Sequence, residues 1–79
     1  MSHLKGGSMM ALAFMGIGER RKVTKLRGKD EVIRHLQDLG FAPGSEVQVL
    51  GENAAGMILL VKGVRIALDR GLASKIMVA

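Results

Sequence analysis

The sequence predicts a small β-rich α+β domain in which about five short strands form a barrel with one short helix. Three observations carry this prediction. One apolar stripe with helical spacing ends at a glycine, short apolar runs alternate with polar residues, and glycine-containing turn pairs separate these runs. A period of two is typical of strands, whereas spacings of three and four residues are typical of a helix. The pattern therefore favours several strands around a single helix.

Composition limits the functions that such a chain can have. It has 79 residues, no Cys, no Tyr or Trp, and two His. A domain of this length buries a small core and has little room for a deep catalytic cleft. No nucleophile–base pair or phosphate-binding loop is visible. We therefore expect a protein that is not an enzyme and has no cofactor or small-molecule substrate, while its net charge of +5 favours anionic partners.

The N-terminal residues are expected to lie outside the folded unit. Residues 1–10 are largely polar and Gly-rich and end in a pair of methionines. This is the composition of a flexible leader, of the kind that cloning can add. The remainder, residues 11–79, contains no linker and is expected to be one domain. At its start Leu12 and Phe14 alternate with alanines, which favours either a short edge strand or an extended arm laid on the barrel.

A strongly basic strand is predicted before Gly28, with Val23 and Leu26 at its apolar positions. The basic residues of this region are Arg20, Arg21, Lys22, Lys25, Arg27 and Lys29. They support one alternative function, which is nucleic-acid binding by a basic SH3-like domain. We favour a solvated surface and expect no nucleic-acid partner, because the chain lacks the aromatic side chains on which single-strand binders stack bases.

One short helix is predicted from Asp30 to about Leu39, with Asp30 as its N-cap. The residues expected to face inward are Val32, Ile33, Leu36 and Leu39. The outer face carries Glu31, His35 and Asp38, spaced i, i+4 and i+7. Such residues on a short helix usually form solvated pairs, so we expect no metal site, and these three are the only candidates for one.

The helix is predicted to end in a packed corner. Gly40 falls where a left-handed residue closes a helix, and Leu36 and Phe41 then occupy the two positions that touch in a Schellman cap. Pro43 and Gly44 hold the positions that a type II turn prefers. The residues with a structural role in this corner are Leu36, Leu39, Gly40, Phe41, Pro43 and Gly44.

Strands are predicted on the C-terminal side of this corner. Glu46–Leu50 alternates polar with apolar residues, whereas residues 51–56 have loop composition. Lys62-Gly63 suits a type I′ hairpin turn that places Val61 opposite Val64. The face of this hairpin expected to enter the core comprises Met57, Leu59, Val61, Val64, Ile66 and Leu68. Residues 72–74 are expected to form a helical turn, and residues 76–78 a closing strand.

The opposite face of the same hairpin is the predicted partner-binding surface. It comprises Ile58, Leu60, Arg65 and Ala67. Two alternatives are open for its apolar members. Either residues 10–14 or the helix covers them within the molecule, or they form a patch for self-association or for docking a partner, because exposed contiguous apolar surface usually marks an interface.

The corner and its surroundings resemble the ferrous iron transport protein A family, whose fold is a small SH3-like barrel. The shared features are the Leu-Gly-Phe-Ala-Pro-Gly string at residues 39–44, a Gly18-to-Gly28 opening with Val23 and Leu26, the run 61–68, and the run 73–78. They extend from about residue 12 to 78. The apolar strand 57–61 and the Glu52-Asn53 loop look like the forms of anaerobic Gram-positive bacteria.

The resemblance implies a cytoplasmic accessory protein of bacterial ferrous iron uptake, located at the inner face of the cell membrane. It implies a partner, the membrane ferrous iron permease with a GTPase domain, which the protein would bind and modulate. It implies no active site, and a homo-oligomer is compatible with it. Similar SH3-like domains also occur in iron-dependent transcriptional repressors, so an iron-regulator-type domain is the other alternative.

Overall fold

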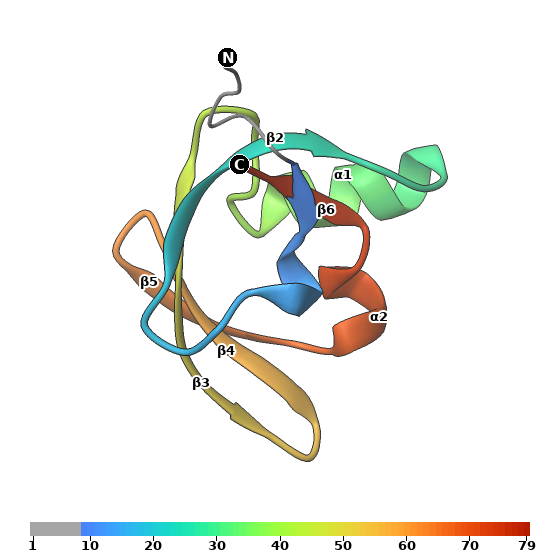
Figure 1. Ribbon diagram of the computed structural model, residues 1–79. Helices are drawn as coiled ribbons and strands as arrows, with labels where there is room; N and C mark the ends of the chain where they lie inside the picture. Colours follow the sequence, from blue (N-terminus) through green and yellow to red (C-terminus); the bar gives the residue numbers. More distant parts are fainter. Residues whose placement is uncertain (1–8) are drawn as a thin grey trace.

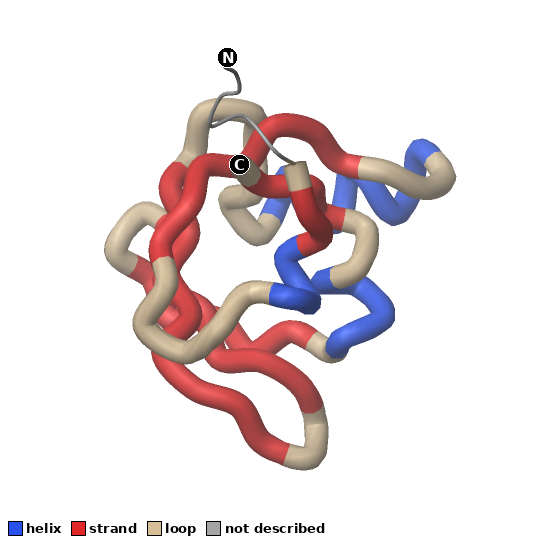
Figure 2. Tube along the Cα trace, viewed as in Figure 1, coloured by secondary structure: helices blue, strands red, loops and turns tan. Residues whose placement is uncertain are grey.

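A single antiparallel sheet curves around the core in the computed structural model, which describes residues 9–79. The strands are β1 (Met10–Ala11), β2 (Arg20–Leu26), β3 (Glu46–Asn53), β4 (Gly56–Val61), β5 (Val64–Leu68) and β6 (Ile76–Val78). Their order across the sheet is β1-β6-β2-β3-β4-β5. The helices are α1 (Asp30–Asp38) and α2 (Arg70–Ala73), with a 3-10 turn at Leu12–Phe14. Figures 1 and 2 show the sheet curving into a partly open barrel, which confirms the predicted fold class.

The barrel interior holds the hydrophobic core. Its fully buried side chains come from the strands, the 3-10 turn, the helices and the corner after α1: Leu12, Val23, Leu36, Phe41, Val47, Val49, Met57, Leu59, Val61, Ala73, Ile76 and Val78. None of the described residues buries a charged or polar side chain in this core. No helix within residues 9–79 is long and apolar enough to cross a membrane.

The corner after α1 has the predicted geometry. Gly40 has φ +109°, in the region that favours glycine. The Phe41 N–H donates to the Leu36 carbonyl at 3.1 Å, and the Gly40 N–H donates to the Gln37 carbonyl at 2.9 Å. These two bonds define a Schellman cap. In the following turn the Ser45 N–H donates to the Ala42 carbonyl at 2.9 Å, and Gly44, at φ +93°, occupies the position that a type II turn reserves for glycine.

The hairpin of β4 and β5 has the predicted register. Val61 pairs with Val64, Leu60 with Arg65, Leu59 with Ile66, Ile58 with Ala67 and Met57 with Leu68. The turn residues Lys62 and Gly63 both have positive φ, +52° and +79°, as a type I′ turn requires. The expected core face is confirmed for Met57, Leu59, Val61 and Leu68, which are buried.

Val64 was expected in the core and is 58% exposed, so this part of the prediction is wrong. It begins β5, which ends the sheet, and no described strand lies beyond it. Period-two alternation identifies the face on which a side chain lies, whereas its burial also depends on how far the barrel extends over that face.

Of the two alternatives predicted for Leu12 and Phe14, the edge strand is wrong. These residues form the 3-10 turn, and the strand is the preceding pair Met10–Ala11, which pairs with Val78 and Met77. Leu12 enters the core while Phe14 is 77% exposed. The expected leader, residues 1–10, lies outside the described residues except for its last two positions.

Two further boundaries differ from the sequence prediction. Lys29, and not Asp30, is the N-cap of α1, and no side chain caps that end. Residues 51–53 extend β3 and Gly56 opens β4, so the predicted loop shrinks to Ala54-Ala55. The Asn53 side chain accepts hydrogen bonds from the N–H groups of Ala55 and Gly56, at 2.9 and 3.1 Å. A local side-chain bond of this kind replaces the long loop that the composition indicated.

Candidate functional site

The four residues predicted to bind a partner lie together on the outside of β4 and β5. We call Ile58, Leu60, Arg65 and Ala67 the outer patch. Leu60 pairs with Arg65 and Ile58 pairs with Ala67, so all four project from one face. Arg65 and Ala67 are exposed, and Ile58 and Leu60 are half-buried. On its other side Ile58 faces Gly51 in β3, so both of its cross-strand neighbours are small.

The two segments considered as possible covers of the outer patch, residues 10–14 and the helix, pack elsewhere. Leu12 lies in residues 10–14, which we call the arm, and is fully buried in the core. Strand β1 lies at the opposite end of the sheet order from β5. From α1, Leu36 is the fully buried residue, and Val32, together with Leu39 at the helix C-cap, packs against the same core. Leu12, Leu36 and Val32 are thus used by the core, whereas Ile58 and Leu60 neither belong to that core nor pack against it.

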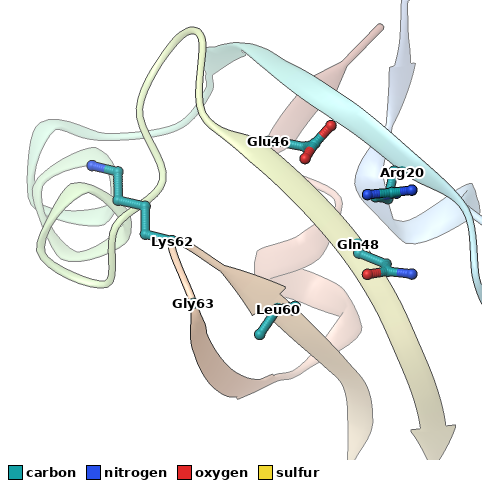
Figure 3. Close-up of a pocket in the computed structure, with 6 residues that line it drawn as sticks. All are labelled: Arg20, Glu46, Gln48, Leu60, Lys62 and Gly63. Atoms are coloured by element: carbon teal, nitrogen blue, oxygen red, sulfur yellow. The ribbon is translucent and has the colours of Figure 1, made fainter.

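An open pocket of about 250 Å³ adjoins the patch. It is lined by Arg20, Glu46, Gln48, Leu60, Lys62 and Gly63. Arg20 pairs with Gln48, and Gln48 pairs with Leu60, so these three side chains form one row across β2, β3 and β4. Figure 3 shows Glu46 beside Arg20, and the Lys62 side chain extending away from the other lining residues. Leu60 thus supplies the apolar part of a pocket whose other walls are polar.

The sheet face around the patch is positively charged. Arg20 and Lys22 on β2 and Arg65 on β5 are exposed, and Glu46 is the one carboxylate that the register places on this face of β2 to β5. The ion pairs within residues 9–79 join Arg21 to Glu19 and Arg70 to Glu52, away from this face. Arg20 and Arg65 are therefore free to meet an anionic partner.

The sequence prediction did not include Arg20, Glu46 and Gln48 in the site. A signal for them existed, since Glu46 and Gln48 alternate with the core residues Val47 and Val49. The same alternation that placed Leu60 outside the hairpin places them outside β3. Their position beside Leu60 depended on the strand order, which periodicity alone does not provide.

The basic residues considered for nucleic-acid binding do not share one face. Arg20 and Lys22 lie on the outer face, whereas Arg21 alternates to the opposite side and bonds Glu19, with 2.7 Å between Arg21 Nε and Glu19 Oε2. Glu19 Oε1 also accepts the Gly16 N–H at 2.9 Å. The Gly16 hydrogen bond, followed by the Arg21 hydrogen bond and charge, lowers the pKa of Glu19 below its ordinary value.

The metal-ligand candidates Glu31, His35 and Asp38 all lie exposed on α1. Within the part of the chain that the structure describes, no three His, Cys, Asp or Glu side chains are grouped to hold a metal ion. The structure therefore brings together the outer patch and its basic surroundings, but not these three residues. An apolar surface with unpaired cations suits the binding of another macromolecule.

Comparison with known proteins extends this description. A family model described as "FeoA domain" matches residues 10–79. A protein of Methanocaldococcus jannaschii, named as an Fe(2+) transport protein A, is 37% identical over 70 residues, which are 89% of this chain and 85% of that protein.

Solved structures share the fold as well as the sequence pattern. The crystal structure of an iron uptake regulatory protein (FeoA) is 33% identical with a TM-score of 0.80, and the match covers 91% of this chain and 96% of that one. A zinc complex of FeoA from Stenotrophomonas maltophilia, described as an SH3 domain protein, is 25% identical with a TM-score of 0.76, over 89% of each chain. The barrel is therefore SH3-like, as predicted.

Proposed function

The chain belongs to the FeoA domain family, and on that basis we propose that it binds and modulates a membrane ferrous iron permease that carries a GTPase domain. The family is involved in ferrous iron transport and is an accessory family, not one known for catalysis. Membership of this family was the expectation from the sequence motifs, and the family match confirms it. The permease as partner is our inference.

The observation that carries the proposal is the outer patch. A small domain gains stability by burying apolar side chains, yet Ile58 and Leu60 lie outside its buried core and stay partly exposed on the sheet, beside the exposed Arg65 and Ala67. An apolar centre with a polar, charged rim is the usual anatomy of a protein–protein interface. Docking a partner on this face would remove Ile58 and Leu60 from water.

The charge of the same face supports a partner at the membrane. Arg20, Lys22 and Arg65 would attract acidic segments of a protein, and the basic face would also be drawn toward anionic lipids. We place the protein in the cytoplasm, peripheral to the inner face of the cell membrane, because the GTPase domain of such a permease is its cytoplasmic part. Self-association through the same patch is the competing use.

Binding to the purified permease from the same organism tests the proposal. The protein is immobilised, and the detergent-solubilised permease is titrated over it, with an unrelated membrane protein in the same detergent as the control. We expect saturable binding to the permease alone, weakened by salt because the rim is charged. Equal retention of both membrane proteins, or no retention of the permease by folded protein, would contradict the proposal. Sedimentation of the protein alone measures self-association.

A further inference from the structure

Strand β5 has an unpaired edge. It pairs with β4 on one side and stands last in the order of the sheet, with no strand of residues 9–79 on its other side. Figure 1 shows β5 leaving the hairpin turn and running to α2. Edge strands are the places where another chain can add a strand. Natural proteins usually protect them with charged side chains, prolines or bulges, whereas β5 has a regular register, no Pro and one charged residue, Arg65.

The backbone groups that point outward from this edge follow from the turn. In a two-residue type I′ hairpin the residues that flank the turn, Val61 and Val64, exchange both hydrogen bonds, and bonding then alternates along the strand. The N–H and C=O groups of Arg65 and Ala67 therefore point away from β4. No described backbone or side-chain group bonds to them, and both residues are exposed. The edge presents two donors and two acceptors.

The side chains of β5 define what kind of strand would fit. On the inner side Val64 is 58% exposed and Ile66 is only partly buried, so an added strand would meet apolar surface there. On the outer side it would meet Arg65, the one charged residue of β5, whereas Arg20 and Lys22 lie three strands away on β2. The matching strand alternates apolar residues, directed inward, with acidic residues, directed outward.

We propose that the β5 edge binds an extended, acidic segment of the partner protein by strand addition. Residues of the partner next to this segment would contact the outer patch. The partner's identity rests on the proposed function, whereas the mode of binding does not. Four main-chain hydrogen bonds to Arg65 and Ala67 hold the segment, and alternate side chains select it.

Charge excludes a second copy of this chain as the favoured occupant. An antiparallel pair of β5 edges that joined the outward-pointing groups would place Arg65 opposite Ala67 of the other copy. β5 contains no carboxylate, so each Arg65 would stay without a counter-ion while two positively charged faces approached each other. An acidic segment supplies the missing charge.

Synthetic peptides test the proposal with the full chain. The probe is a capped peptide of about seven residues, the length of an ordinary strand, which alternates Val and Glu; its control alternates Val and Lys. Binding is followed by amide NMR and hydrogen exchange. We expect the Val/Glu peptide to slow exchange at the Arg65 and Ala67 N–H groups about tenfold or more, and to bind about tenfold more tightly than the Val/Lys peptide.

Two variants make the result specific to the edge. Ala67→Pro removes one outward N–H without removing a bond to β4 and should abolish peptide binding, whereas Ala67→Ser keeps that N–H and should retain it. Arg65→Glu should reverse the preference toward the Val/Lys peptide, and this outcome does not depend on how Ala67→Pro folds.

Other results would overturn the proposal. These are equal binding of both peptides, or shifts confined to other elements while the Arg65 and Ala67 amides exchange unchanged. Protection of the two amides that rises with protein concentration, in the absence of peptide, would identify a second copy as the occupant. If the permease binds and the peptides do not, the edge inference fails alone; if the Val/Glu peptide binds and the permease does not, the proposed function fails alone.

Discussion

The Phe41 N–H donates to the Leu36 carbonyl at 3.1 Å across the end of α1, and both side chains are fully buried. This pair joins the helix to the strand that follows it. The connection requires the chain to reverse at Gly40, at φ +109°. A residue with a Cβ reaches such a φ at a cost, and a β-branched residue at a higher one.

We predict that Gly40→Val destabilises the domain by about 1–2 kcal/mol or more. Space is not the reason, because an added Cβ would lie 3.6 Å from Val61, an ordinary contact. The matched control is Gly51→Val, at a strand position with open space and without a positive φ. Urea unfolding measures both variants. Equal urea midpoints for the two variants would contradict the view that position 40 requires a left-handed backbone conformation.

A larger effect is expected from Gly56→Ala. A Cβ at Gly56 would lie 2.3 Å from the Leu68 carbonyl oxygen and 2.7 Å from the Asp69 Cα. Both are backbone atoms, so β4 and the end of β5 would have to separate, at a cost of about 1–3 kcal/mol or more. Thermal unfolding of Gly56→Ala beside Gly51→Ala measures this. A melting temperature for Gly56→Ala as high as that of the control would show that the two strands are less closely packed than described.

The Glu19 carboxylate gives a pH-dependent contribution to stability. Its pKa is lowered in the folded protein, first by the Gly16 N–H and then by Arg21. The ionised form therefore stabilises the fold above the unfolded pKa, and this contribution is lost as the pH falls through the folded pKa. We expect Arg21→Gln to raise the pKa of Glu19 in an NMR titration, whereas Lys25→Gln should not. An unchanged Glu19 pKa in Arg21→Gln would remove Arg21 as a cause.

Calorimetry with ferrous or zinc ions should show no tight stoichiometric complex. The helix candidates Glu31, His35 and Asp38 are exposed and do not form a closed coordination shell. Sub-micromolar binding in the protein, lost in His35→Ala and kept in Lys29→Ala, would contradict this prediction and assign a metal-sensing role to α1.

Local chemistry made the corner and the hairpin predictable. Gly40, Pro43-Gly44 and Lys62-Gly63 each demand a backbone geometry that few other residues adopt cheaply, and the structure has that geometry at each of them. The arm before β2 was not predictable in this way. Leu12 and Phe14 lack local constraints, and the 3-10 turn that buries Leu12 depends on its packing beside α2 and β6. Tertiary packing outweighed alternation there.

The site was predictable in part for the same reason. The turn fixed the register that gathers Ile58, Leu60, Arg65 and Ala67 on one face. The neighbours of that face, Arg20 and Gln48, come from strands whose order a single sequence does not specify. Whether the arm and helix would cover the patch also depended on where the barrel left room for them.

Stability measurements should show that the outer patch belongs to the surface and not to the core. Ile58→Ser combined with Leu60→Ser should leave unfolding nearly unchanged, because both side chains lie outside the buried core and do not pack against it. Leu59→Ala, between them in the sequence and fully buried, should cost about 2–5 kcal/mol. If the double variant unfolds as easily as Leu59→Ala, the outer patch is part of the core.

The affinity of the double variant for the purified permease tests the central claim most directly. The matched control replaces two exposed apolar side chains outside the patch, Phe14→Ser with Ile17→Ser, which are 77% and 65% exposed in the native protein. We expect the permease to bind the control as tightly as the native protein and to bind Ile58→Ser/Leu60→Ser at least about tenfold more weakly, as the loss of central apolar contacts predicts. Undiminished binding of the folded patch variant would contradict the account.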